Sequence, residues 1–198
     1  NQIAYAEPSF FRLFDFELLK GDKKTCLSMP GQVVITERIA SKYFKDEDPI
    51  GKIFIFTGAY DKISCEVTGV MKEMPSNSHI HYSFLISYKS LPKYMQEYWY
   101  KHEAYTYVLL DSPERKAEIE REFPVMAEKY KTDEALKNKT WGVSLIPLAD
   151  IHLTPQVGYE AETKGNRSSM IALIFAAIAI LAIAWINYIN LTVARSME

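Results

Sequence analysis

The longest apolar run of the chain lies near its C-terminal end. Every residue from Met170 to Ile186 is apolar, and the apolar character continues past two asparagines to Leu191. As a helix, Met170–Leu191 would be roughly 33 Å long, enough to cross a hydrocarbon core of about 30 Å. A signal-peptide core would be shorter and N-terminal, and a fully buried helix of this length is rare in a small domain. The pattern therefore predicts one transmembrane helix at residues 169–192, preceded by a water-soluble region.

The two sides of this predicted helix differ in side-chain size. At 100° per residue, one narrow stripe is small or polar except for Ile183, and the opposite side carries bulky residues such as Ile174, Ile178 and Trp185. Small side chains let a second helix approach closely, and a buried asparagine can hydrogen-bond to it. The alternative is chance in an alanine-rich span, with the asparagines reaching the lipid headgroups. We predict a helix-packing face made of Ala172, Ala176, Ala179, Asn187 and Asn190.

The water-soluble region opens with a strand pattern and an aromatic turn. Gln2–Ala6 is typical of a short strand, and Pro8–Phe14 of a short helix in which an early proline costs no hydrogen bond. Lys20–Lys24 predicts a turn. Three aromatic side chains are expected on the buried side of the short helix: Phe10, Phe11 and Phe14.

Residues 30–75 predict a β-α-β-β unit. Its first strand is Gln32–Thr36, and the Thr36 hydroxyl can cap a helix that Pro49 must end. Two strands follow, Ile53–Phe56 and Ile63–Met71, joined by a hairpin turn. Alternation along the last strand places one set of side chains on the same face: Ile63, Cys65, Val67 and Met71.

The pattern downstream predicts a β-α-β unit. After an extended Tyr82–Tyr88 and a helix at Lys93–Lys101, Ala104–Leu110 alternates as a strand. Trp141–Leu148 would be its second strand, and residues 156–168 a linker into the span.

The helix between those two strands has a clear start signal. Ser112 can cap it and Pro113 suits its first position, whereas Pro124 must kink or split it. One face of this helix is apolar: Ile119, Phe123, Met126 and Tyr130.

Composition narrows the class of protein. The 198 residues carry 23 Lys and Arg against 25 Asp and Glu, a net charge of −2, so no basic surface for nucleic acid is expected. Thirteen Tyr and ten Phe favour a packed globule over a disordered tether. Because the chain begins at Asn1 without a Met, we expect it to be a piece of a longer protein whose preceding part carries the domain across the membrane.

Candidate chemistry is sparse. Gly51-Lys52 lacks the remaining residues of a phosphate-binding loop, and no nucleophile motif or zinc-protease motif occurs. His79 and His81 could share one side of a strand and bind a metal with His102, His152 or a carboxylate, but hydrogen-bonding structural histidines are the alternative. We therefore expect no catalytic residue, no cofactor and no metal.

Cys26 and Cys65 leave the redox state of the chain open. They could form one disulfide in an oxidising compartment, but two cysteines also occur by chance, and the sequence gives no distance between them. The acidic run Asp46-Glu-Asp48 lacks the ligand spacing of a calcium loop and is interpreted as a solvated helix end.

A set of segments occurs along the chain in a specific order: Pro8–Phe14, Leu19-Lys-Gly21, Gln32–Lys52, Val67–Val70, Pro75–His79, Pro147–Leu153, Trp185–Leu191 and Ala194-Arg-Ser196. In this order they resemble the periplasmic core domain and second transmembrane helix of MacB/FtsX-type ABC transporter permeases, in the form common in Bacteroidetes. The resemblance covers nearly the whole chain.

The resemblance implies a fold class and a set of partners. The fold would be α+β, with a porter-like lobe of two β-α-β halves at residues 1–29 and 76–155, an inserted lobe at 30–75, one transmembrane helix and a cytoplasmic end at 193–198. Residues 1–168 would be periplasmic, on the bacterial inner membrane. Implied partners are a separate cytoplasmic ABC ATPase subunit, a second permease in a dimer and a periplasmic adaptor, besides membrane lipid. The implied function is mechanical and is driven by ATP hydrolysis on the ATPase partner. The resemblance does not specify the transported substrate or the signal.

Two other classes remain as alternatives. A ligand-binding sensor or receptor ectodomain with a single membrane anchor fits the same pattern, and hydropathy of the full-length gene would separate it from a permease. An extracellular enzyme on a stalk is the weakest alternative, because the sequence offers no catalytic residues.

Overall fold

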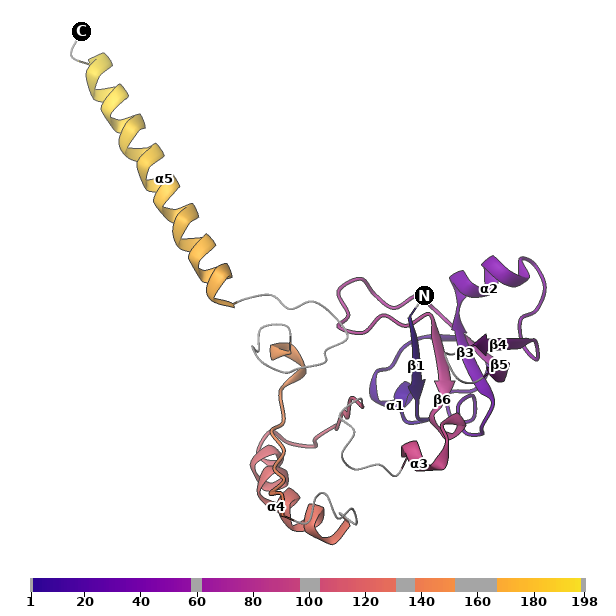
Figure 1. Cartoon of the computed structure of the whole chain (residues 1–198). Helices are drawn as coiled ribbons and strands as arrows, with labels where there is room; N and C mark the ends of the chain where they lie inside the picture. Colours follow the sequence, from indigo (N-terminus) through magenta and orange to yellow (C-terminus); the bar gives the residue numbers. More distant parts are fainter. Residues whose placement is uncertain (1, 58–61, 97–103, 131–137, 152–166, 197–198) are drawn as a thin grey trace. The chain divides into compact units, whose positions relative to one another are not determined.

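The computed structural model describes residues 2–57, 62–96, 104–130, 138–151 and 167–196 (Figure 1). The chain divides into two compact units, Asn1–Leu145 and Ile146–Glu198.

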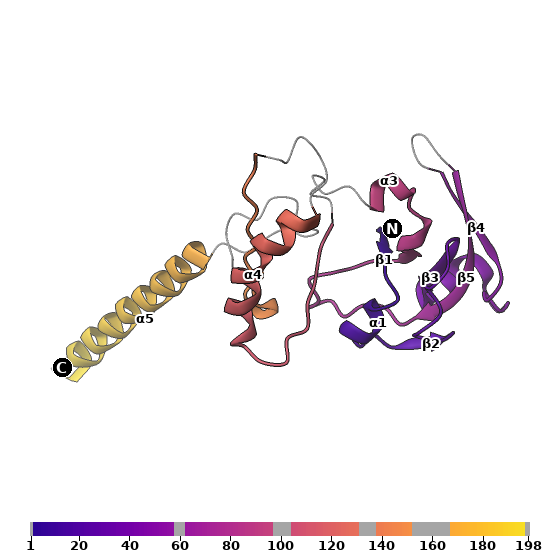
Figure 2. The same cartoon turned by 90° about the horizontal axis from the view of Figure 1, so that it is seen from below.

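The first unit is built on one mixed sheet. Six strands take part, in the order β1-β6-β3-β5-β2, with β4 paired to β5. The β1–β6 and β3–β5 pairs are parallel, and β2–β5, β3–β6 and β4–β5 are antiparallel. In Figure 2, β4 and β5 run side by side as a two-stranded arm. The strands are β1 Ile3–Ala6, β2 Leu18–Lys20, β3 Gln32–Thr36, β4 Ile53–Thr57, β5 Lys62–Met71 and β6 Phe84–Ser87.

The helices of the first unit are mostly short. The longest by far is α4, and η1 is a single 3₁₀ turn. Their bounds are α1 Phe10–Leu13, α2 Glu37–Phe44, η1 Tyr88–Ser90, α3 Lys93–Gln96 and α4 Arg115–Tyr130.

Each face of the sheet has its own core. Consecutive residues of a strand point to opposite faces, so Val34 and Leu85 belong to one cluster while their neighbours Val33 and Ile86 belong to the other. Segments outside the sheet complete each core. The first cluster receives Phe11, Cys26 and Leu27, and the second receives Ile39 of α2.

Several predicted elements are confirmed. The Thr36 hydroxyl accepts from the Ile39 N–H at 3.5 Å and so caps α2, which ends at Phe44. Phe11 of α1 is buried, with Phe10 and Phe14 packed against the same core. The predicted helix at 93–101 begins as α3; its remainder and the tip of the β4–β5 hairpin lie outside the described residues.

The predicted face of Met71 is wrong, because β5 contains a bulge. Val33 pairs with Val67, but Val34 pairs with Gly69, so Thr68 has no partner in the ladder. One extra residue reverses the alternation beyond it. Val70 therefore joins Cys65 and Val67 in the second cluster, and Met71 lies in the first.

A second correction concerns the predicted strands Ala104–Leu110 and Trp141–Leu148. Neither is a strand in the structure; both run as irregular chain on either side of α4, apart from a 3₁₀ turn η3 at Leu148–Asp150. Alternation makes a segment suitable for a sheet, but a strand forms only where a neighbouring edge supplies hydrogen bonds. Of the two outcomes predicted at Pro124, a kink or a split, the split does not occur, since one helix runs through that residue.

The predicted division into two lobes is not confirmed. Strands from the predicted first half (β1, β2), the inserted lobe (β3, β4, β5) and the second half (β6) all belong to one sheet. Sheet pairing links β3 to β6 and β2 to β5 across both proposed boundaries. The boundaries at residues 29, 75 and 155 stay predictions.

The second unit contains the predicted apolar helix. Helix α5 covers Arg167–Ser196. Its segment Ser169–Ser196 is long and apolar enough to cross a membrane, and no part of its most apolar stretch is buried in the protein. It is the one such helix in the described ranges. The helix at the predicted span is thus confirmed. Of the predicted linker 156–168, residues 156–166 lie outside the described residues, and residues 167–168 already belong to α5.

Candidate functional site

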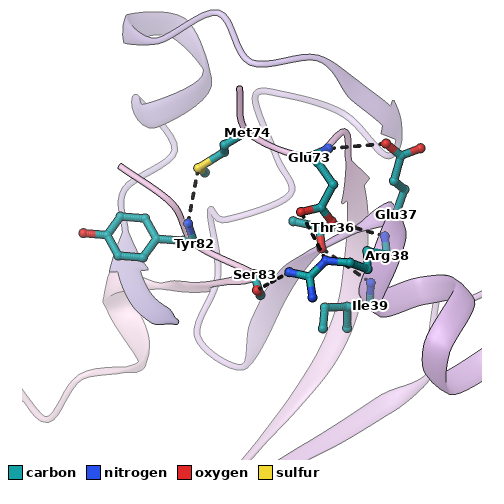
Figure 3. A network of polar contacts seen from close by, with 8 residues as sticks. All are labelled: Thr36, Glu37, Arg38, Ile39, Glu73, Met74, Tyr82 and Ser83. Carbon is teal, nitrogen blue, oxygen red and sulfur yellow. Dashed lines mark hydrogen bonds and ion pairs between the residues drawn. The ribbon is translucent and has the colours of Figure 1, made fainter. Parts of the chain in front are cut away.

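A polar junction connects the start of α2 to the ends of two strands (Figure 3). Glu73 follows β5; its Oε1 accepts from the Arg38 N–H at 3.3 Å, and its Oε2 lies 3.5 Å from the Arg38 Nε. The Arg38 Nη2 donates to the Ser83 hydroxyl before β6 at 3.3 Å. The Glu73 N–H in turn donates to the Glu37 carboxylate at 3.4 Å. We call this set, Glu37, Arg38, Glu73 and Ser83, the α2 junction.

The α2 junction borders a depression of about 270 Å³. Side chains of Arg38 and Glu73 are 59% and 39% exposed, so their ion pair is a surface pair worth on the order of 0–1 kcal/mol. The Glu73 carboxylate is occupied by a helix N–H and a guanidinium. The arrangement holds the start of α2 against the ends of the two strands. The depression is lined by Gln2, Arg38, Glu73, Met74, His81, Tyr82 and Ser83.

The two candidate metal ligands have separate hydrogen-bond partners. His79 Nε2 lies 2.9 Å from the Tyr107 hydroxyl, and His81 Nε2 lies 3.0 Å from the Pro75 carbonyl oxygen. Across the residues that the structure describes, no group of three or more His, Cys, Asp or Glu side chains is placed to bind a metal. His152 and His102 lie outside the described residues.

Tyr107 attaches the segment before α4 to the sheet side of the unit. Its ring meets Phe14 edge-on at 4.8 Å between centroids and His79 at 5.4 Å. Phe14 itself stacks with Phe16 and meets Phe10 at a tilt, on the first core cluster. We call Phe14, His79 and Tyr107 the aromatic clasp. The sequence analysis did not predict this cluster. The available signal was Tyr107, which occupies an inward position of the alternating segment Ala104–Leu110.

The two cysteines are not bridged. Both are free and buried, Cys26 in the first core cluster and Cys65 in the second, on opposite faces of one sheet. Burial raises the pKa of the Cys26 thiol to about 11 and raises the pKa of the Cys65 thiol too. Both side chains are therefore neutral packing groups near neutral pH and poor nucleophiles.

The acidic run after α2 makes surface ion pairs. Lys52 Nζ lies 2.7 Å from Glu47 Oε2, and Lys20 Nζ lies 3.0 Å from Asp48 Oδ1. The bond from Lys52 lowers the pKa of Glu47, and the Ile50 N–H followed by Lys20 lowers that of Asp48. These carboxylates stabilise the turn that follows α2, which agrees with their interpretation as a solvated helix end.

The predicted helix-packing face lies wholly exposed on α5. Every residue of α5 from Ser169 to Ser196 is exposed. Thr192 donates to the Tyr188 carbonyl of its own helix at 2.8 Å. The face therefore stays a prediction: Ala172, Ala176, Ala179, Asn187 and Asn190.

Comparison with known proteins places this geometry in a family. Residues 1–124 match the model of the MacB-like periplasmic core domain. Among solved structures, the chain is similar to a domain of a Porphyromonas gingivalis protein designated a permease, with a TM-score of 0.53 and 22% identity over 66% of this chain and 59% of that one. It is also similar to the periplasmic region of MacB from Actinobacillus actinomycetemcomitans, with a TM-score of 0.39 and 16% identity over 62% and 53%. The chain thus spans less than two thirds of either relative. No curated protein matches it.

Proposed function

Because the chain belongs to the MacB-like periplasmic core domain family, we propose that it is the extracytoplasmic domain and one membrane helix of an ABC transporter permease. The observation that carries the proposal is the order of parts: a region matching the family over residues 1–124, followed by an exposed apolar helix of 28 residues. Such a helix, about 42 Å long, is sufficient to cross a bilayer. Residues 1–168 would lie in the periplasm and 193–198 in the cytoplasm of an inner-membrane protein.

In this proposal the domain is a mechanical part. A cytoplasmic ABC ATPase subunit hydrolyses ATP, and α5 transmits the resulting movement to the periplasmic sheet, for export or for signalling. One feature supports a mechanical part: the polar contacts at the α2 junction connect elements to one another.

Topology is the first test of this function. A cysteine introduced at Arg195 should react with a membrane-impermeant thiol reagent only after the cytoplasmic side is opened, whereas a cysteine at the exposed Glu17 should react in intact cells. Reaction of Arg195→Cys from outside would contradict the proposed orientation.

The ATPase partner is the second test. The full-length protein purified from its native membrane should retain an ABC ATPase subunit. Copurification of a kinase or an adaptor in its place would favour the sensor alternative.

We also propose that the small face of α5 packs on a neighbouring transmembrane helix. The hydrogen bond from a buried asparagine would contribute on the order of 0.6–2 kcal/mol in a membrane. Ala179→Leu should then impair assembly or transport more than the matched Ile178→Ala on the bulky side. Tolerance of both Ala179→Leu and Asn187→Leu together with failure of Ile178→Ala would show that the faces are assigned the wrong way round.

A further inference from the structure

Strand β4 is an edge strand that carries no protection against pairing. Its one sheet neighbour in the described residues is β5. Natural edge strands commonly carry a charge, a proline or a bulge that blocks further pairing. The sequence Ile53-Phe-Ile-Phe-Thr57 has none of these, and Ile53 and Ile55 are 57% and 67% exposed.

Hydrogen bonding to β5 determines which backbone groups of β4 face outward. Val67 N–H donates to the Lys52 carbonyl, so Ile53 and Glu66 form a non-hydrogen-bonded pair. Antiparallel pairs alternate, and therefore Phe54 and Phe56 direct their backbone groups toward β5. The outward N–H and C=O groups are those of Ile53, Ile55 and Thr57, and no bond among the described residues reaches them.

We propose that β4 pairs antiparallel with β4 of a second copy of this chain, about a two-fold axis at Ile55. This register alone brings all three outward residues of each copy into hydrogen-bonded positions, because Ile55 faces itself and Ile53 faces Thr57. Three such pairs make about six backbone hydrogen bonds. A two-fold interface of this kind is closed and stops at the dimer.

Charge complementarity adds a small preference for the same arrangement, because the charges concerned lie on strands about 14 Å apart. On the exposed face, Glu66 of β5 lies beside Ile53, and Lys62 lies beside Thr57. The two-fold pairing puts Ile53 of one copy opposite Thr57 of the other. A line drawn across the four adjacent strands at this level therefore begins at Glu66 of one copy and ends at Lys62 of the other. Parallel pairing of the two copies would put like charges in the same row. On the other face, Phe54 would meet Phe56, an aromatic cross-strand pair.

The side chains beneath β4 make it a rigid platform for such pairing. Phe54 contacts Phe44 and Phe84 edge-on at 5.4 Å between centroids, and Phe56 contacts Phe84 at 5.3 Å. The strand is therefore already ordered by its own domain, and less conformational entropy is lost when a second strand is added. The proposal adds an interface between periplasmic domains and holds whether or not the chain proves to be a permease.

Site-directed cross-linking of the full chain in its membrane tests the register. Ile55→Cys should form a covalent dimer with itself, because hydrogen-bonded partners lie about 5.5 Å apart at Cα, within disulfide reach. Ile53→Cys alone should give a dimer band at least about fivefold weaker, because two copies of residue 53 lie about 14 Å apart along the strands. Ile53→Cys and Thr57→Cys, coexpressed with different tags, should cross-link to each other.

A matched backbone variant separates pairing from folding. Ile55→Pro removes an N–H that faces the free edge, where proline is tolerated, and should abolish the cross-link between Ile53→Cys and Thr57→Cys. Burial of Cys26 against thiol reagents reports that the sheet has stayed folded. Glu66→Lys should weaken cross-linking, and adding Lys62→Glu should restore it. Three results would overturn the proposal: no dimer from Ile55→Cys, equally strong dimers from Ile53→Cys alone, or cross-links to a different protein.

Discussion

The sheet and the region around α4 belong to one unit but are stabilised in different ways. All four residues of β6 are buried, and five strand pairs connect the sheet by backbone hydrogen bonds. In α4, Ala127 is the single buried residue of sixteen. Within that region the Leu145 N–H donates to Glu120 at 2.7 Å, and the aromatic clasp connects the region to the first core cluster. Stability should therefore reside in the sheet, and adaptability near α4.

The largest expected difference comes from matched truncations of the two regions. Leu85→Ala removes a fully buried side chain and should lower the free energy of unfolding by about 2–5 kcal/mol. Val125→Ala on α4 removes a side chain that is 75% exposed and should change it by less than about 0.5 kcal/mol. Urea unfolding of the chain in detergent, followed by circular dichroism, measures both. Similar losses would mean that α4 is as much a part of the core as β6.

A glycine pair tests how tightly the sheet is packed around its bulge. Gly21 has φ of +95°, and a Cβ there would lie 2.4 Å from the Thr68 carbonyl oxygen. Gly21→Ala should cost about 2–4 kcal/mol, since strain and a backbone clash add. Gly31 also has positive φ, but its nearest neighbour would be 3.6 Å away, so Gly31→Ala should cost only about 1 kcal/mol. Equal losses of unfolding free energy for the two variants would show that the close approach to the Thr68 carbonyl oxygen adds nothing to the cost of Gly21→Ala.

The aromatic clasp predicts a smaller and local effect. Tyr107→Phe keeps the ring against Phe14 and loses the hydroxyl bond to His79, which should cost about 1 kcal/mol. Tyr107→Ala loses both and should cost more. Amide hydrogen exchange should accelerate in residues 104–130 and stay unchanged in β3 and β6. Acceleration spread evenly over the sheet would contradict the separation of the two regions.

The smallest effect concerns pH at the turn after α2. The pKa of Glu47 is lowered by Lys52, so its contribution is present above the ordinary carboxyl pKa and is lost as pH falls through the lowered value. Lys52→Met should raise the pKa of Glu47 toward its ordinary value in a carboxyl-detected NMR titration. Because the Glu47 side chain is 70% exposed, stability at neutral pH should hardly respond. An unchanged pKa in Lys52→Met would show that the ion pair does not persist in solution.

The segments best predicted from the sequence were those whose local signals agreed with their tertiary surroundings. Thr36 caps α2 as expected, and β3 and β4 occupy their predicted positions. Ala104–Leu110 alternates just as well and yet forms no strand. Alternation records which side of a segment is apolar, but sheet formation depends on a free edge elsewhere in the chain, and a local pattern contains no information about that edge.

The contacts around the candidate site were harder to predict for the same reason. Arg38, Glu73 and Ser83 are up to 45 positions apart, and only the topology of the sheet brings them together. Alternation along β4 implies that one of its two sides faces outward. Which side faces the core was not encoded in the strand itself, where both sides are apolar, so the exposure of Ile53 and Ile55 could not be predicted.

The bulge at Thr68 also constrains how this strand can vary in length. Loss of one residue from β5 near Thr68 would restore a regular ladder and exchange the faces of Val70 and Met71, moving each into the other's core. Loss or gain of two residues would preserve the faces. Insertions and deletions in this part of the fold are therefore expected in even numbers, and a relative that differs by one residue here should carry a compensating bulge on β3 or β2.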